Sequence, residues 1–137
     1  MKSYRSTHVL KLPCYRELDG DLVAIENNIG DFFCIKRIFY IYNVPKNECR
    51  ADHASKNTDF LMIAISGCVN ICIDNGYEKK MYYMKSRDKG LYVPCNNWIR
   101  VHYLSEEAVL LVLANTKYNE SVYYKDYREF LDRNVRD

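Results

Sequence analysis

The chain has 137 residues, enough for one domain that buries roughly two-thirds of its unfolded surface, and we expect a single domain over residues 1–137. Its formal net charge is +2, with 20 basic and 18 acidic residues interspersed, so it lacks the basic stripe of a sequence-independent nucleic-acid binder. No apolar run approaches the ~20 residues of a membrane-spanning helix. We therefore expect neither a nucleic acid nor a membrane as partner.

The six cysteines indicate reduced thiols rather than a disulfide framework. No signal peptide is recognisable ahead of them, and no Cys-x-x-Cys motif occurs. Cys68 and Cys72 lie four residues apart on a predicted strand, which suits two small core residues better than a metal site. Reduced thiols are typical of the cytoplasm, so we expect a cytoplasmic protein.

The first half of the chain is predicted to form short strands. Asp19-Gly20 predicts a turn ahead of a strand over residues 21–26. Residues 28–31 break the chain before residues 35–42, which form the most strand-like segment because of their β-branched and aromatic side chains. Residues 44–47, which include a proline, end that strand.

The second half continues the all-β pattern and ends in a helix. Asn75-Gly76 predicts a type I′ hairpin turn. Apolar residues at helical spacing predict a short amphipathic helix over residues 124–131. Roughly nine strands with a terminal helix favour a jelly-roll barrel over an immunoglobulin-like sandwich. The later strands are expected at 60–66, 69–73, 79–84, 89–93, 98–104 and 109–114.

A histidine motif lies ahead of the apolar strand at 60–66. His53-Ala54-Ser55 occupies the place where a barrel of the cupin kind carries His-x-His, and Asp59 replaces the usual glutamate. A second cupin-like segment, Gly90 to Trp98, contains no histidine. A transition metal needs several converging imidazole and carboxylate ligands, so we expect a metal-free cupin barrel without a cofactor.

The chain resembles a known enzyme family over nearly its whole length. The resemblance rests on segments at matching order and spacing: Gly20–Glu26, Ile35–Pro45, Arg50–Lys56, Gly90–Pro94, Trp98, Leu113-Ala114 and Tyr118–Phe130. These segments are similar to those of the bacterial sugar-nucleotide 3,4-ketoisomerases of the cupin superfamily, the FdtA and QdtA type of WxcM-like proteins. Those enzymes act on dTDP-4-keto-6-deoxyglucose.

The resemblance implies an isomerase that moves a keto group from carbon C4 to carbon C3 of a dTDP-linked 4-keto-6-deoxyhexose. It also implies a cytoplasmic homodimer, paired through exchanged strands, that uses no metal or cofactor. Its product would enter the synthesis of 3-amino-3,6-dideoxysugars for surface glycans such as lipopolysaccharide O-antigen.

The reaction needs a base that removes the proton on C3, and histidine suits this because its pKa lies near neutrality. In the family the motif reads His-Ala-His-Lys, and the second histidine is the usual candidate for the base. Ser55 occupies that position here. Residues two apart on a strand point to the same side, so we expect His53 and Ser55 to share the barrel interior, with His53 as the base and Ser55 as its hydrogen-bond partner.

Cationic residues near the motif are candidates for binding the nucleotide diphosphate. Arg50 and Lys36 are the first two, because a guanidinium makes bidentate charge-assisted contacts with phosphate. Lys36 and Arg37 are neighbours on one strand, so only one of them points inward. Arg37 is favoured because Phe39 and Ile41, on the same face, look core-directed.

The remaining candidates line or flank the expected sugar site. Tyr40 is a candidate acid, Tyr42 and Tyr92 are hydrogen-bond donors, and Trp98 is a surface on which thymine could stack. Asp19 and Ile99 occupy positions that, in the family, bear on the C4 configuration of the product, and their identities fit neither common pattern. Two alternatives stay open: a catalytically silent sugar-nucleotide-binding cupin, or a related isomerase or epimerase for another nucleotide sugar.

Overall fold

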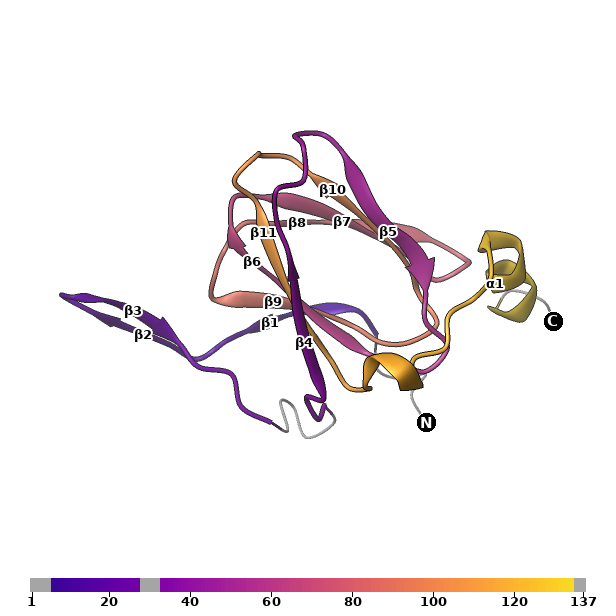
Figure 1. The fold of residues 1–137 in the computed structure, drawn as a ribbon, viewed down its shortest axis with the longest axis horizontal. Helices are drawn as coiled ribbons and strands as arrows, with labels where there is room; N and C mark the ends of the chain where they lie inside the picture. The colour runs from indigo at the N-terminus through magenta and orange to yellow at the C-terminus, as the bar shows by residue number, and fades with distance from the viewer. Residues whose placement is uncertain (1–5, 28–32, 135–137) are drawn as a thin grey trace.

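The computed structural model describes residues 6–27 and 33–134. In that part of the chain, eleven strands form two facing sheets and one separate hairpin, followed by a single α-helix (Figure 1). This arrangement confirms the predicted all-β cupin jelly-roll with a short C-terminal helix. No described helix has the length and apolar character needed to cross a membrane.

The two sheets and the hairpin are antiparallel throughout. The five-stranded sheet has the order β1 (His8–Lys11), β9 (Lys89–Val93), β6 (Phe60–Ser66), β11 (Val109–Ala114) and β4 (Arg37–Ile41). The four-stranded sheet has the order β5 (Cys49–Ala54), β10 (Trp98–Tyr103), β7 (Val69–Asp74) and β8 (Lys79–Met84). The separate hairpin pairs β2 (Cys14–Glu17) with β3 (Gly20–Val23).

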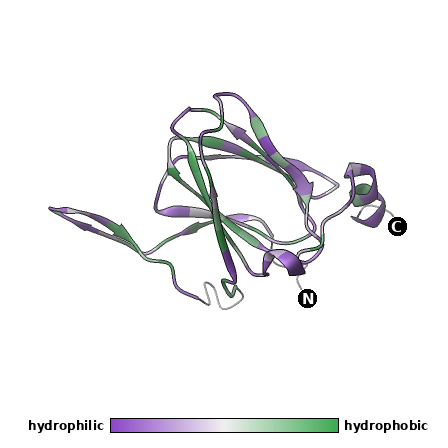
Figure 2. Cartoon of the chain, in the orientation of Figure 1, coloured by the Kyte–Doolittle hydropathy of each residue, from purple (hydrophilic) through white to green (hydrophobic). Residues whose placement is uncertain are grey.

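Strand β6 shows why the five-stranded sheet is apolar on both faces. Phe60, Met62 and Ala64 point inward and belong to the core between the sheets. Leu61 and Ile63 point outward into a second cluster, which also contains Leu12, Phe33 and Tyr92. A strand that is buried on both faces reads as a continuous apolar run, and Figure 2 shows hydrophobic residues concentrated on the barrel strands.

The hairpin β2–β3 extends away from the barrel (Figure 1). Tyr15, Leu18 and Leu22 on it are exposed. The turn lies at Leu18-Asp19, and β3 ends at Val23, earlier than the predicted end at residue 26. Because both faces of this hairpin are largely solvent-exposed, the two short strands carry little of the alternation that marks a half-buried strand.

Two local predictions were wrong. The connection between β7 and β8 is a four-residue loop, Asn75–Glu78, in which only Gly76 has a positive φ, whereas a type I′ turn needs two such residues. Oδ1 of Asn75 accepts from the backbone N–H groups of Tyr77 and Glu78, at 2.8 and 2.9 Å, which stabilises the wider loop. Helix α1 (Tyr127–Asn134) begins three residues later than predicted because Asp126 caps it, with Oδ1 accepting from Glu129 N–H at 2.8 Å.

Candidate active site

A cavity of about 200 Å³ lies between the two sheets. Most of its wall is aliphatic or aromatic, and its polar side chains are those of Arg50, His53 and Tyr103. An apolar pocket with a few convergent polar groups is typical of a small-molecule site. The wall is formed by Phe39, Ile41, Arg50, Ala51, His53, Phe60, Met62, Ile99, Val101, Tyr103, Leu110 and Val112.

The order of the strands defines the rim and the back of this cavity. β4 and β5 are edge strands of their sheets, so Phe39, Arg50 and His53 line it from the edges. β10 lies one strand in from the edge and places Ile99, Val101 and Tyr103 on the back wall. A ligand that enters between the edges of β4 and β5 would therefore meet Arg50 and His53 before it reaches Tyr103.

A bulge in β5 sets the direction of His53. Ala51 and Asp52 have φ angles of 76° and 60°, and the pairing of β5 with β10 shifts between Ile99 and Arg100. The indole Nε1 of Trp98 donates to Oδ1 of Asp52 at 2.9 Å, which holds the bulged residue. Bulges of this kind re-aim the next side chain and recur beside active sites.

His53 has the properties of a neutral base. Burial lowers the pKa of its imidazole below 6.5, although its own backbone and the Asp52 carboxylate partly oppose this effect. Within the described residues, its buried Nδ1 has no hydrogen-bond partner. The ring of Tyr123 packs edge-on against the imidazole, with centroids 4.9 Å apart. His53 is therefore neutral at pH 7 and has a ring nitrogen without a protein partner.

Ser55 does not line the cavity with His53. It follows the last residue of β5, is 1% exposed, and makes an isolated bridge with Tyr123. Its Oγ accepts from the backbone N–H of Thr58 at 2.9 Å and of Asn57 at 3.2 Å. The hydroxyl therefore stabilises the loop between β5 and β6 by accepting hydrogen bonds from its backbone, as serine side chains commonly do in turns.

Other predicted residues divide between the cavity and its surroundings. Arg50 and Ile99 line the cavity with His53. Arg37 is half-buried near it, with its guanidinium carbon 5.3 Å from the Phe39 ring centroid and Nη2 donating to Ser121 Oγ at 3.2 Å. Lys36 is exposed.

The predicted aromatic residues lie outside the cavity. Tyr40 and Tyr42 are exposed on the outer face of β4 and its continuation. Tyr92 is buried in the outer cluster, where its hydroxyl donates to Asp59 Oδ2 at 3.1 Å. Trp98 packs against α1, with its ring centroid 5.2 Å from that of Tyr127. The remaining candidate, Asp19, is exposed at the turn of the projecting hairpin.

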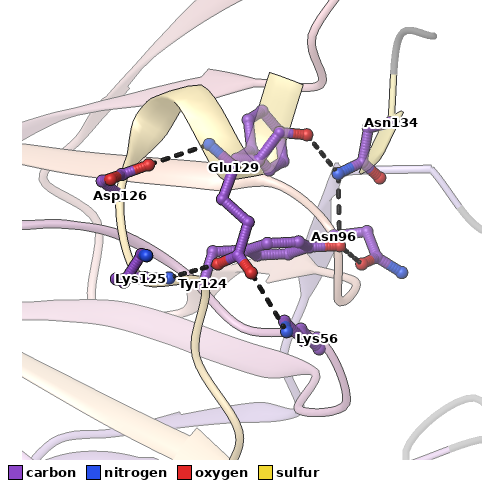
Figure 3. A network of polar contacts seen from close by, with 8 residues as sticks. Lys56, Asn96, Tyr124, Lys125, Asp126, Glu129 and Asn134 are labelled. Carbon is purple, nitrogen blue, oxygen red and sulfur yellow. Dashed lines mark hydrogen bonds and ion pairs between the residues drawn. The ribbon is translucent and has the colours of Figure 1, made fainter. Parts of the chain in front are cut away.

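The C-terminal segment covers one end of the site, where the Tyr123 ring packs against His53. The sequence did not predict this contact. Figure 3 shows how the segment is held: Glu129 accepts from the Lys125 N–H at 2.6 Å and lies 3.7 Å from the Lys56 ammonium. The Tyr124 hydroxyl donates to Asn96 Oδ1 at 2.6 Å. The only sequence signal for this role is the aromatic density of residues 118–130.

The charged side chain of the cavity lining, Arg50, is cationic. Arg50 brings positive charge to the cavity lining, where it suits a phosphate group. Among residues 6–27 and 33–134, no group of three or more His, Cys, Asp or Glu side chains is arranged to hold a metal ion. The chemistry of the cavity is therefore that of one imidazole, one phenol and a guanidinium.

Residues 5–135 match the protein family described as FdtA: WxcM-like, C-terminal. The chain belongs to this family. The TDP-4-oxo-6-deoxy-alpha-D-glucose-3,4-oxoisomerase of Aneurinibacillus thermoaerophilus is 34% identical over 111 residues, which cover 81% of this chain and 80% of that enzyme. The resemblance found in the sequence is thereby confirmed.

Solved structures of family members have the same fold. WlaRA, a TDP-fucose-3,4-ketoisomerase from Campylobacter jejuni, is 34% identical with a TM-score of 0.86, over 93% of this chain and 95% of that one. QdtA, a sugar 3,4-ketoisomerase from Thermoanaerobacterium thermosaccharolyticum solved with TDP, is 30% identical with a TM-score of 0.90, over 96% of both chains. A histidine-to-asparagine variant of QdtA was solved with TDP-4-keto-6-deoxyglucose.

Proposed function

We propose that this protein is a 3,4-ketoisomerase that converts TDP-4-keto-6-deoxyglucose to a TDP-3-keto-6-deoxyhexose. The observation that carries the proposal is His53, a neutral imidazole with an unpartnered buried nitrogen, in the cavity of a chain whose relatives are sugar 3,4-ketoisomerases. A nucleotide sugar fits the charge of the site, because Arg50 lies on the rim and a diphosphate would remain outside the apolar cavity.

The reaction is an internal proton transfer that needs no oxidant. His53 removes the proton from C3, and the electrons of that C–H bond form the C3–C4 double bond as charge moves to the oxygen on C4. The imidazolium N–H exchanges with solvent, and the imidazolium then delivers a proton to C4. The hydroxyl proton on the oxygen of C3 passes to the oxygen of C4, so C3 becomes the ketone and C4 the alcohol.

The activity is tested by incubating the protein with TDP-4-keto-6-deoxyglucose and trapping the product with a 3-aminotransferase that does not accept the 4-keto sugar. We expect the mass of a TDP-3-amino-3,6-dideoxyhexose to appear only when both proteins are present. Failure to form it at high enzyme concentration, while TDP binds, contradicts the proposal for this sugar and favours a silent binding protein.

A homodimer fits the exposed surface of the chain. Tyr15 and Leu22 on the hairpin, and Ile38 and Tyr40 on the edge strand β4, expose large apolar side chains. An unpaired edge and an apolar hairpin suit a second copy of this chain with exchanged strands. Sedimentation at micromolar concentration should give twice the mass of the chain, and a monomer contradicts this assignment.

One variant locates this interface. Leu22→Glu on the hairpin should shift the protein toward monomer, because it buries an unpaired charge in the dimer. Met81→Glu is the matched control, since Met81 has a similar exposure on β8, which lies on the edge of the other sheet. A dimer that dissociates only in the control variant would place the interface elsewhere.

The expected place of the enzyme in metabolism follows from the product. A 3-keto sugar is the substrate class of aminotransferases that make 3-amino-3,6-dideoxysugars, and such sugars are incorporated into surface glycans such as lipopolysaccharide O-antigen. All six cysteines are free, which suits the reducing cytoplasm.

A further inference from the structure

The back wall of the cavity holds a polar group that the proposed reaction has not yet used. Tyr103 is 0% exposed, and its hydroxyl has no hydrogen-bond partner within the described residues. A buried hydroxyl without a partner destabilises the free protein, because it has given up its hydrogen bonds to water. His53 Nδ1 is a second unpartnered buried atom of a residue that lines the same cavity. Unsatisfied groups that meet in one cavity point to a ligand that satisfies them.

Tyr103 and His53 reach the cavity from different directions. His53 pairs with Ile99 on β10, and Tyr103 follows Ile99 by four residues on the same strand. At roughly 3.3 Å per residue, the two backbone positions are about 13 Å apart along the strand. The side chains therefore flank a ligand instead of contacting each other.

The shape of the substrate decides which atom Tyr103 meets. The cavity, at about 200 Å³, is smaller than the roughly 300–1,000 Å³ of pockets for drug-sized ligands, so it suits the hexose and leaves the nucleotide outside. The nucleotide is attached at C1, which must face the rim. C4 lies across the ring from C1 and must face the back wall.

We propose that the Tyr103 hydroxyl donates a hydrogen bond to the C4 oxygen of the keto sugar and stabilises the negative charge that forms there. The inference rests on the proposed function, because that charge forms when His53 removes the C3 proton. Tyr103 is then a catalytic residue, whereas the predicted Tyr40 lies outside the cavity.

The ionisation of Tyr103 suits a hydrogen-bond donor. Burial raises the pKa of its hydroxyl to about 12, and the Arg50 charge partly opposes this shift. The phenol therefore keeps its proton at neutral pH. A preorganised donor in an apolar site stabilises a developing oxyanion without reorganisation.

Tyr103→Phe tests the inference, with Tyr82→Phe as the matched control. Tyr82 is also partly buried against the core, but it lines a different pocket, outside the cavity. We expect Tyr103→Phe to lower kcat about 100-fold, as for loss of an oxyanion donor, and to weaken binding of the keto sugar by a smaller factor, because the same hydroxyl donates a weaker hydrogen bond to the ground-state ketone. The melting temperature of the free variant should equal or exceed that of the wild type, because the substitution removes an unsatisfied buried hydroxyl.

Thermal shifts separate this inference from the proposed function. In the wild type, TDP-4-keto-6-deoxyglucose should raise the melting temperature more than TDP does, and Tyr103→Phe should reduce the difference while Tyr82→Phe preserves it. Wild-type kcat and an unchanged sugar-dependent shift in Tyr103→Phe overturn the inference, as does a lower melting temperature of the free variant. A sugar-dependent shift that is reduced in Tyr103→Phe, without turnover by the wild type, supports the contact and refutes only the activity. No sugar-dependent shift in the wild type contradicts both.

Discussion

The rings of His53 and Tyr123 meet edge to face, with their planes at 70° and their centroids 4.9 Å apart. Tyr123 reaches this place because its backbone bridges to Ser55 and because the following residue, Tyr124, donates to the Ala54 carbonyl at 3.0 Å. The C-terminal segment is therefore part of the environment that keeps His53 neutral.

Removing the Tyr123 ring should change the pH dependence of turnover. In Tyr123→Ala, water reaches the imidazole, so the pKa of His53 rises toward 6.5. The acid limb of the kcat/KM profile should then move to higher pH, with a rate at pH 6 lower by up to about 4-fold, because an imidazole with a pKa of 6.5 is about one-quarter neutral at that pH. Tyr123→Phe keeps the ring and should retain the wild-type profile. Identical profiles for all three proteins would show that the ring does not control His53.

Folding stability should also depend on His53. Its folded-state pKa lies below its unfolded value of 6.5, so the unfolded chain takes up a proton first as pH falls. The contribution of the neutral imidazole is fully present above pH 6.5 and is lost as pH falls below that value toward the folded-state pKa. His53→Gln should therefore lose less stability than the wild type between pH 7 and 5, as measured by urea unfolding at each pH. An equal loss in both proteins would exclude this linkage.

The strands with strong local patterns could be predicted from the sequence. The residues of β6, β8 and β11 were predicted with their observed bounds, because continuous apolar or aromatic runs between turn residues leave little choice. The family could also be identified, because its matching segments are spread over the chain. Strands β1 and β2 were missed, being short and largely exposed.

The arrangement of the site depends on contacts that sequence spacing does not encode. Ser55 was expected inside the barrel by strand alternation, but β5 ends at Ala54 and the serine turns into the next loop. The bulge at Ala51 and Asp52 places two non-glycine residues at positive φ, which no propensity favours. Tyr103 and Tyr123 come from distant segments, so their relation to His53 required the tertiary structure.

The bulge gives a prediction about backbone strain. Ala51 has a φ of 76°, a conformation that costs an alanine about 1 kcal/mol and costs glycine little. Ala51→Gly should therefore stabilise the protein by up to about 1 kcal/mol, measured by urea unfolding. Ala54→Gly is the matched control, because Ala54 is fully buried without a positive φ and its methyl group packs against the C-terminal aromatic cluster. Ala54→Gly should destabilise the fold. Loss of stability in both variants would contradict the claim that the backbone is strained at Ala51.

The buried hydroxyl of Ser55 should matter for stability more than for chemistry. Ser55→Ala leaves two loop N–H groups without their acceptor and should cost about 1–3 kcal/mol of unfolding free energy. Because Ser55 does not line the cavity, turnover of the folded variant should stay within about threefold of the wild type. A variant with wild-type stability and no activity would instead make Ser55 a catalytic group.

The identity of the base is tested most directly by incubating the enzyme with TDP-4-keto-6-deoxyglucose in deuterium oxide and following C3 and C4 of the sugar by NMR. The account predicts conversion to the 3-keto sugar with solvent deuterium appearing at C4, and loss of both conversion and exchange at C3 in His53→Gln, which keeps its fold and its affinity for TDP. Conversion that persists in His53→Gln, or a wild type that binds the sugar without exchanging the C3 proton, would contradict it.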